Sequence, residues 1–162
     1  MSFDVRTYRK ALGCFPTGVT VVTTVDAAGA PIGVTVNSFT SLSLDPPLVL
    51  FCLDNKNSGL EAFQRSGHFV INVLRYEQRE LSITFASRNI EKWKGVGFDA
   101  GHLGAPILHH CLAHFECSTV AVHEGGDHSI FIGRVDKLDY SEAGQPLVYY
   151  RGTYAESGCG VP

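Results

Sequence analysis

The segment Gly33-Val-Thr-Val-Asn-Ser-Phe-Thr-Ser-Leu-Ser-Leu-Asp-Pro-Pro-Leu48 lies between two apolar runs and decides how the rest of the chain is interpreted. The runs on either side, residues 18–25 and 48–53, have the composition of buried strands. The segment itself is rich in uncharged hydroxyl and amide side chains, which form hydrogen bonds without a permanent charge. We therefore expect it to hold a planar, polar ligand such as a cofactor. A solvated loop with turn-forming side chains is the alternative.

Most of the remaining chain has the pattern of β-strands. An apolar stripe of Val5, Tyr8, Leu12 and Phe15 predicts an opening helix that ends at Pro16 and Gly18. A hairpin turn is expected at residues 26–29. The predicted strands are residues 18–25, 30–39, 48–53, 68–74, 111–122, 129–138 and 147–150, and two more helices are predicted at residues 58–65 and 77–86. We expect a looser stretch over residues 87–106. Many strands with a few peripheral helices predict one mainly β domain over residues 1–162, a closed or nearly closed antiparallel barrel.

Composition narrows the class of protein. The net charge of −3 argues against nucleic acid as a partner, because nucleic acid requires a basic surface. No apolar run approaches the roughly 20 residues that cross a bilayer, and residues 1–6 lack the order of a signal peptide, so no membrane association and a cytoplasmic location are expected. Only 18% of the residues are charged, which favours a surface covered by a partner and hence a homodimer.

The cysteines and histidines give no clear sign of a disulfide or a metal site. Five cysteines without C-x-x-C spacing predict reduced thiols, with Cys14, Cys52 and Cys117 packed as small apolar residues. His110 and His114 would share a face only on a helix. The segment is predicted as a strand, in which four residues span ~13 Å, too far for two ligands of one ion. No metal site is therefore expected.

Two common catalytic motifs are also missing. The glycine cluster at residues 95–101 has the wrong spacing for a dinucleotide-binding fingerprint and follows no predicted strand, so a flexible loop is expected there. No serine lies in a G-x-S-x-G motif, and no cysteine has an evident neighbouring base. The chain does not have the pattern of a Rossmann protein or of a hydrolase.

Three motifs occur in an informative order. They are Phe15-Pro-Thr-Gly-Val19, the run Thr35-Val-Asn-Ser-Phe-Thr-Ser41 with its ending Asp45-Pro-Pro-Leu48, and Gly126-Asp-His128 followed by Leu147-Val-Tyr-Tyr-Arg-Gly-Thr-Tyr154. From about Tyr8 to Tyr154 the chain resembles the short-chain flavin reductases, the NAD(P)H-dependent partners of two-component flavin monooxygenases. The resemblance implies a homodimeric split β-barrel of the Greek-key, FMN-binding type, which binds FMN or FAD and passes reduced flavin to a separate oxygenase.

The resemblance also implies site residues. It implies that the polar run contacts the flavin ring and ribityl chain through Thr35, Val36, Asn37, Ser38, Thr40 and Ser41. It implies that Cys52, Asp54 and Ser58 lie near the flavin phosphate and that Phe85 and Ala86 lie beside the flavin. It associates His128 with the nicotinamide nucleotide and places Tyr154 near the same pocket. His128 is the candidate catalytic residue. Trp93 stands where many relatives have phenylalanine.

The residues themselves leave alternatives beside this assignment. The edges of a flavin ring need neutral hydrogen-bond partners, which the polar run supplies. Packing is nonetheless the expected role of the Cys52 side chain and of Phe85, and His128 could simply fix a turn through Asp127. The start of the helix near Ser58 could offer free backbone N–H groups to a phosphate.

The expected reaction is hydride transfer from NADH or NADPH to the flavin. The main alternative is a non-catalytic or sensory FMN-binding barrel. A flavin-dependent oxidase resembling the pyridoxamine-phosphate-oxidase barrels and a structural interaction module are the others. The sequence does not decide between FMN and FAD or between NADH and NADPH.

Overall fold

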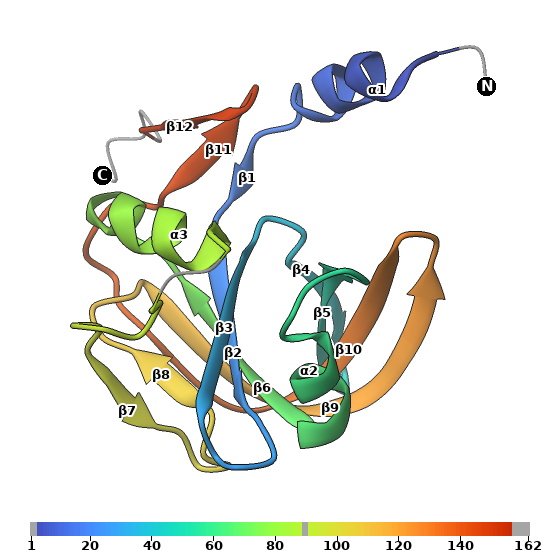
Figure 1. The fold of residues 1–162 in the computed structure, drawn as a ribbon. Coiled ribbons are helices and arrows are strands. Elements are labelled where there is room, and N and C mark those ends of the chain that lie inside the picture. Colours follow the sequence, from blue (N-terminus) through green and yellow to red (C-terminus); the bar gives the residue numbers. More distant parts are fainter. Residues whose placement is uncertain (1–2, 89–90, 157–162) are drawn as a thin grey trace.

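A seven-stranded antiparallel sheet forms the body of the molecule in the computed structural model, which describes residues 3–88 and 91–156 (Figure 1). Its order is β3-β2-β6-β9-β10-β5-β4. The strands are β2 (Thr20–Val25), β3 (Pro31–Val36), β4 (Thr40–Leu44), β5 (Pro47–Asp54), β6 (His68–Val73), β9 (Ala113–Gly125) and β10 (His128–Tyr140). The sheet is strongly curved, but its edge strands β3 and β4 do not pair with each other. The predicted mainly β, split-barrel fold is confirmed, and the barrel is open rather than closed.

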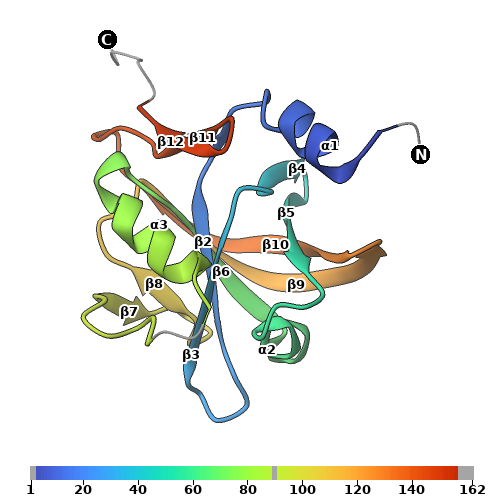
Figure 2. The same ribbon diagram turned by 45° about the horizontal axis from the view of Figure 1, so that its top comes forward.

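Two small sheets and three helices surround this body (Figure 2). One small sheet has the order β1-β11-β12, and the hairpin of β7 and β8 forms the other. No helix in the described part of the chain is long and apolar enough to cross a membrane. The bounds are β1 (Thr17–Gly18), β11 (Val148–Tyr150), β12 (Thr153–Ala155), β7 (Phe98–Ala100), β8 (Pro106–Leu108), α1 (Val5–Leu12), α2 (Leu60–Ser66), the 3₁₀ turn η1 (Tyr76–Gln78) and α3 (Arg79–Ala86).

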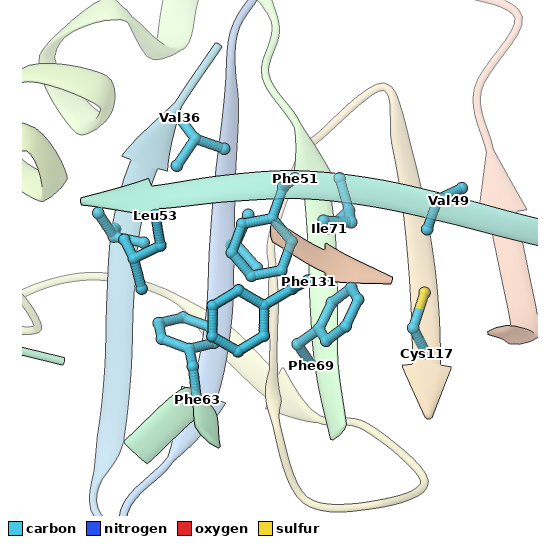
Figure 3. Packing of buried hydrophobic residues seen from close by; sticks show 11 residues of the cluster. Val36, Val49, Phe51, Leu53, Phe63, Phe69, Ile71, Cys117 and Phe131 are labelled. Carbon is cyan, nitrogen blue, oxygen red and sulfur yellow. The ribbon is translucent and has the colours of Figure 1, made fainter. Parts of the chain in front are cut away.

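Strand β2 is buried on both faces, which explains its unbroken β-branched sequence. Val22 faces an aromatic core in the curve of the sheet, where the Phe51 and Phe131 rings stack with their centroids 4.9 Å apart (Figure 3). Val21 on the opposite face packs in a second cluster with Phe85 and Leu108. Because both faces of β2 are covered, the strand has no solvent-exposed side and does not show the alternation of a half-exposed strand.

Several predicted elements differ from the observed ones. The opening helix ends at Leu12, where Gly13 is its C-cap, so Phe15 lies outside it. Strand β3 ends at Val36 because the chain then leaves the sheet. A 3₁₀ turn begins the region predicted as a helix from residue 77, and residues 98–100 and 106–108 form a hairpin within the stretch expected to be loose. Strands β4 and β12 were not predicted.

The expectation of packed thiols was right for Cys117 and wrong for Cys14. Burial raises the pKa of Cys117 to about 12, and the buried Cys111 has a pKa raised to about 11 for the same reason. Cys14 is exposed at the end of α1. Cys159 lies outside the described residues.

Candidate functional site

A cavity of about 580 Å³ lies against the edge strand β3. Its walls come from the end of β3, the outer face of β5, the loop after β5 and the C-terminal end of α3. Ten of the predicted site residues line it, so segments distant in sequence meet at one place. They are Thr35, Val36, Asn37, Ser38, Cys52, Asp54, Ser58, Phe85, Ala86 and His128.

Alternation along β5 explains why the cavity has a polar wall beside an apolar core. Phe51 and Leu53 are buried in the core, whereas Cys52 and Asp54 point to the other face and are half-buried. A strand side chain changes face at every residue, so an apolar strand carries its cavity-lining residues between its core residues. The expectation that Cys52 packs among apolar residues is therefore wrong, because it lies in the cavity wall.

Ser38 ties the segment after β3 to strand β5. Its hydroxyl donates to the Cys52 carbonyl at 3.1 Å and accepts from the Cys52 backbone N–H at 2.9 Å. One side chain therefore satisfies the donor and the acceptor that a neighbouring strand would otherwise meet. The Asn37 amide next to it is exposed and forms no hydrogen bond with any described residue, so it is free for a ligand.

Helix α3 is seated on β3 by a close approach at Gly33. A Cβ atom on Gly33 would lie 2.5 Å from the nearest carbon of the Phe85 ring, so only glycine allows this packing. The Thr35 hydroxyl donates to the Ser82 carbonyl at 2.7 Å, which ties β3 to the helix. These contacts place Phe85 and Ala86 at the cavity.

Three predicted site residues do not line the cavity. Thr40 and Ser41 are exposed on the edge strand β4, beyond the last lining residue of the polar run. The Tyr154 hydroxyl lies 2.8 Å from the Ser82 hydroxyl and supports α3. Their proposed contacts with flavin or nicotinamide stay predictions, as do the roles of the other site residues.

The cavity wall also contains three cationic residues to which the sequence assigned no place in the site: Lys56, Arg88 and Lys92. Lys92 donates from Nζ to the Phe85 carbonyl at 2.9 Å, and burial lowers its pKa. Against the single carboxylate of Asp54, three cations give the cavity a net positive charge. A phosphate matches this charge. Scattered single cations give no sequence signal, although Arg88 follows the Phe-Ala pair by two residues.

The loop after β5 differs from the prediction at Ser58. Helix α2 begins at Leu60 rather than at Ser58, and it has only seven residues. The Gly59 backbone N–H is already bound by the Asn57 side chain at 2.8 Å. The predicted helix start at Ser58 is therefore wrong by two residues, and Ser58 lies before the helix with an exposed hydroxyl.

The Gly-Asp-His motif forms the turn between β9 and β10. The Nδ1 atom of His128 lies 2.7 Å from the Asp127 carboxylate, and this hydrogen bond lowers the pKa of Asp127. The other ring nitrogen of His128, Nε2, has no partner among residues 3–88 and 91–156, and His128 is one of the residues of the cavity wall. When Nδ1 donates to Asp127, the neutral ring presents Nε2 as an acceptor, and the protonated ring presents it as a donor.

Asn55 holds this turn in place and was missed by sequence reasoning. Its backbone N–H donates to the Asp127 carbonyl at 3.0 Å, and its side-chain amide donates to the Gly126 carbonyl at 3.3 Å. The Ser129 hydroxyl donates to its side-chain oxygen at 2.7 Å. The loop after β5 and the Gly-Asp-His turn therefore form one unit. Nothing in the sequence spacing signals a contact between residues more than seventy positions apart.

The histidines considered for metal binding lie apart from the cavity. His109 and His110 are in a turn before β9, and the His114 ring contacts the Leu108 carbonyl at 2.8 Å. Across the described residues, no group of three or more His, Cys, Asp or Glu side chains is placed to hold a metal ion.

An open antiparallel barrel whose cavity wall combines uncharged polar groups, three cations and a histidine suits a polar, phosphorylated ligand. Comparison with known proteins identifies the family of this chain. The flavin reductase like domain matches residues 12–158, and the chain belongs to that family.

The chain is similar to several named flavin reductases. The reductase subunit HsaB of a flavin-dependent monooxygenase from Rhodococcus jostii is 45% identical, over 94% of this chain and 78% of that protein. The FMN reductase (NADH) SmoA from Agrobacterium fabrum is 43% identical, over 92% and 84%. Among solved structures, the Streptomyces globisporus NADH:FAD oxidoreductase SgcE6 in complex with NAD and FAD fragments has a TM-score of 0.92 and 34% identity, over 98% and 96% of the two chains.

Proposed function

We propose that this protein is an NADH-dependent flavin reductase that supplies reduced flavin to a separate monooxygenase. The observation that carries the proposal is the cavity beside β3, in which uncharged polar groups, three cations and His128 converge. Relatives named as NADH-dependent FMN reductase and as reductase subunit of a monooxygenase support it. The relative named NADH:FAD oxidoreductase extends the support to FAD.

The residues fit a flavin in both charge and chemistry. The free Asn37 amide and the neutral end of β3 suit the carbonyl and nitrogen edge of a flavin ring. Lys56, Arg88 and Lys92 suit its phosphate. A flavin held by these residues would supply the ring that accepts a hydride from the nicotinamide. The protein contributes by holding the two rings in contact and excluding other geometries.

His128 is proposed to bind and orient the nicotinamide nucleotide. The bond to Asp127 fixes the ring, and Asn55 fixes the turn that carries it. A fixed imidazole with one free nitrogen can contact a carboxamide or a phosphate without a large ordering cost. We do not assign it a proton transfer, because hydride transfer between two cofactors requires none.

A homodimer in the cytoplasm, built from one domain per chain, completes the proposal. Helix α1 supports the dimer because none of its residues is buried, although it carries an apolar stripe. Figure 1 shows this helix standing away from the barrel, joined to it through β1. An isolated helix of eight residues is marginal in water, so we expect a second chain to cover it.

Steady-state oxidation of NADH with and without added flavin tests the function. We expect turnover that depends on FMN or FAD, with NADH preferred over NADPH. Absence of flavin-dependent turnover with both nucleotides would contradict the proposal. A protein that holds flavin firmly yet does not oxidise either nucleotide would instead identify a non-catalytic flavin-binding barrel.

A further inference from the structure

One residue outside the cavity beside β3 joins two parts of the cavity wall. The loop after β5 contributes Lys56, Asn57 and Ser58 to the wall, and the turn between β9 and β10 contributes His128. Asn55 is the first residue of that loop and is not one of the lining residues. Any effect of Asn55 on a bound ligand must therefore be exerted through the residues that it holds in place.

Asn55 holds the turn through its backbone and through both ends of its side-chain amide. Its backbone N–H donates to the Asp127 carbonyl at 3.0 Å, and its Nδ2 donates to the Gly126 carbonyl at 3.3 Å. Its Oδ1 accepts from the buried Ser129 hydroxyl at 2.7 Å. These contacts lie on both sides of His128 in the sequence, so they fix the backbone that carries its ring.

The charge of the loop acts on the same turn. The hydrogen bond and the charge of His128 are the main causes of the lowered pKa of Asp127, and the Lys56 ammonium acts in the same direction. Lys56 therefore lies near the turn as well as in the cavity wall. In the proposed function Lys56 is one of the cations that suit the flavin phosphate. A phosphate held there would contact the loop immediately beside Asn55.

Both segments are held at exposed positions. Asn55, Lys56 and Ser58 are exposed, and the Asp127 side chain is 90% exposed. Hydrogen bonds at exposed positions open at a low cost in free energy. A ligand that binds the loop therefore restricts a segment that is otherwise able to open. Because the bonds of Asn55 join the loop to the turn, restricting one segment also restricts the other.

We propose that Asn55 is a positioning residue that couples the two ligands: a flavin phosphate held by residues 56–58 orders the Gly-Asp-His turn and raises its affinity for the nicotinamide nucleotide. The inference rests on the proposed flavin reductase function. Coupling between two sites is reciprocal, so the nucleotide raises the affinity for FMN by the same factor. Riboflavin has the same ring without the phosphate and therefore leaves the loop unrestricted.

Isothermal titration calorimetry with NAD⁺ in place of NADH measures this coupling without turnover. We expect the dissociation constant for FMN to fall about fivefold when NAD⁺ is saturating, as is usual for two coupled sites. Stacking of the two rings is common to both flavins, so the effect of NAD⁺ on riboflavin affinity should be clearly smaller. Equal effects of NAD⁺ on FMN and on riboflavin in the unaltered protein would overturn the proposal.

Asn55→Ala removes the side-chain bonds that join the loop to the turn. We expect the effect of NAD⁺ on FMN affinity to fall to the level seen with riboflavin, while the affinity for FMN alone changes little, because Asn55 does not line the cavity. Ser129→Ala removes one of the same bonds and should weaken the effect, whereas Ser129→Thr keeps the hydroxyl and should restore it. Ser118→Ala removes a hydroxyl that is bonded to Asp136 elsewhere on β9 and is the matched control.

The possible results separate coupling from a purely structural role. Loss of the NAD⁺ effect in Asn55→Ala, with FMN binding retained, supports the proposal. An undiminished NAD⁺ effect in both Asn55→Ala and Ser129→Ala would overturn it. Parallel losses of affinity for FMN, riboflavin and NAD⁺, each measured alone, would show that Asn55 only supports the fold, and would also overturn it. Absence of flavin-dependent NADH oxidation in the unaltered protein would contradict the proposed function alone, since the coupling is measured without turnover.

Discussion

At the scale of single residues, the candidate site combines groups fixed by the fold with groups left free for a ligand. The Ser38 hydroxyl forms hydrogen bonds with β5, and the Thr35 hydroxyl donates to α3. Both hydroxyl groups are therefore hydrogen-bonded without a ligand. The Asn37 amide and the Nε2 atom of His128 have no partner in the described part of the chain. The polar motif therefore contains side chains that are hydrogen-bonded within the protein and side chains that are left without a partner, and only the structure separates the two groups.

His128 should affect the nicotinamide nucleotide more than the flavin. We expect His128→Ala to raise the KM for NADH about tenfold, the equivalent of one hydrogen bond to a charged group, with a smaller change for flavin. Steady-state kinetics with each substrate varied in turn measures both constants. His123→Ala removes an exposed histidine of β9 outside the cavity wall and is the control. Equal increases in both constants would contradict the assigned role.

At the scale of elements, the site depends on how closely α3 approaches β3. We expect Gly33→Ala to destabilise the protein by about 1–3 kcal/mol, because the new methyl group overlaps the buried Phe85 ring and forces the helix outward. Flavin affinity should fall as well, since Phe85 and Ala86 move with the helix. Urea unfolding and flavin titration measure the two effects.

Gly18→Ala provides the matched control for that substitution. A Cβ atom at Gly18 would meet no atom within 4 Å, and the residue lies in extended backbone of β1. The urea unfolding midpoint of Gly18→Ala should stay close to that of the unaltered protein. If both variants behaved alike, the close packing of α3 on β3 would not be what limits the site.

A carboxylate holds the hairpin of β7 and β8 against β9. The Glu116 side chain accepts from the His102 backbone N–H at 2.6 Å and lies 2.8 Å from Nδ1 of the His102 ring. Burial opposes ionisation of Glu116, but these bonds outweigh it and lower its pKa from the ordinary value of 4.5. A group with a lowered folded pKa stabilises the protein above its unfolded pKa, and this stabilisation is lost as the pH falls through the folded value.

Thermal unfolding between pH 7 and pH 3 tests this contribution. We expect the melting temperature to fall on acidification by several degrees less in Glu116→Gln than in the unaltered protein, because glutamine keeps the acceptor but does not titrate. Glu124→Gln, at an exposed position of the same strand, should leave the pH dependence unchanged. If the melting temperatures of Glu116→Gln and of the unaltered protein fell equally on acidification, Glu116 would not contribute to the pH dependence of stability.

At the scale of the whole molecule, the sequence predicted the barrel class and the place of the cavity. Buried strands such as β2 and β5 have strong local patterns, and the polar run marks the point at which the chain leaves β3. Strand β4 was missed because its residues are mostly exposed, and its pairing with β5 is decided by tertiary contacts. Asn55 and Lys92 were missed because their significance arises only from contacts distant in sequence.

The exposed apolar stripe of α1 leads to the last prediction, which concerns the assembly of two chains. Tyr8 and Leu12 are 51% and 56% exposed, and Phe15 just beyond the helix is 75% exposed. Exposed apolar side chains grouped on an element with no buried residue are typical of an interface rather than of a free surface. We expect the protein to sediment as a homodimer at micromolar concentration.

Introducing charge into this stripe should separate the chains. The double variant Leu12→Glu with Phe15→Glu should sediment as a monomer, because burying two unpaired carboxylates costs more than the interface gains. Leu103→Glu alters an exposed apolar residue in the hairpin of β7 and β8, well away from α1 in Figure 1, and should remain a dimer. A monomer in the unaltered protein would contradict the homodimer. A dimer that survives the double substitution would place the interface on another face of the barrel.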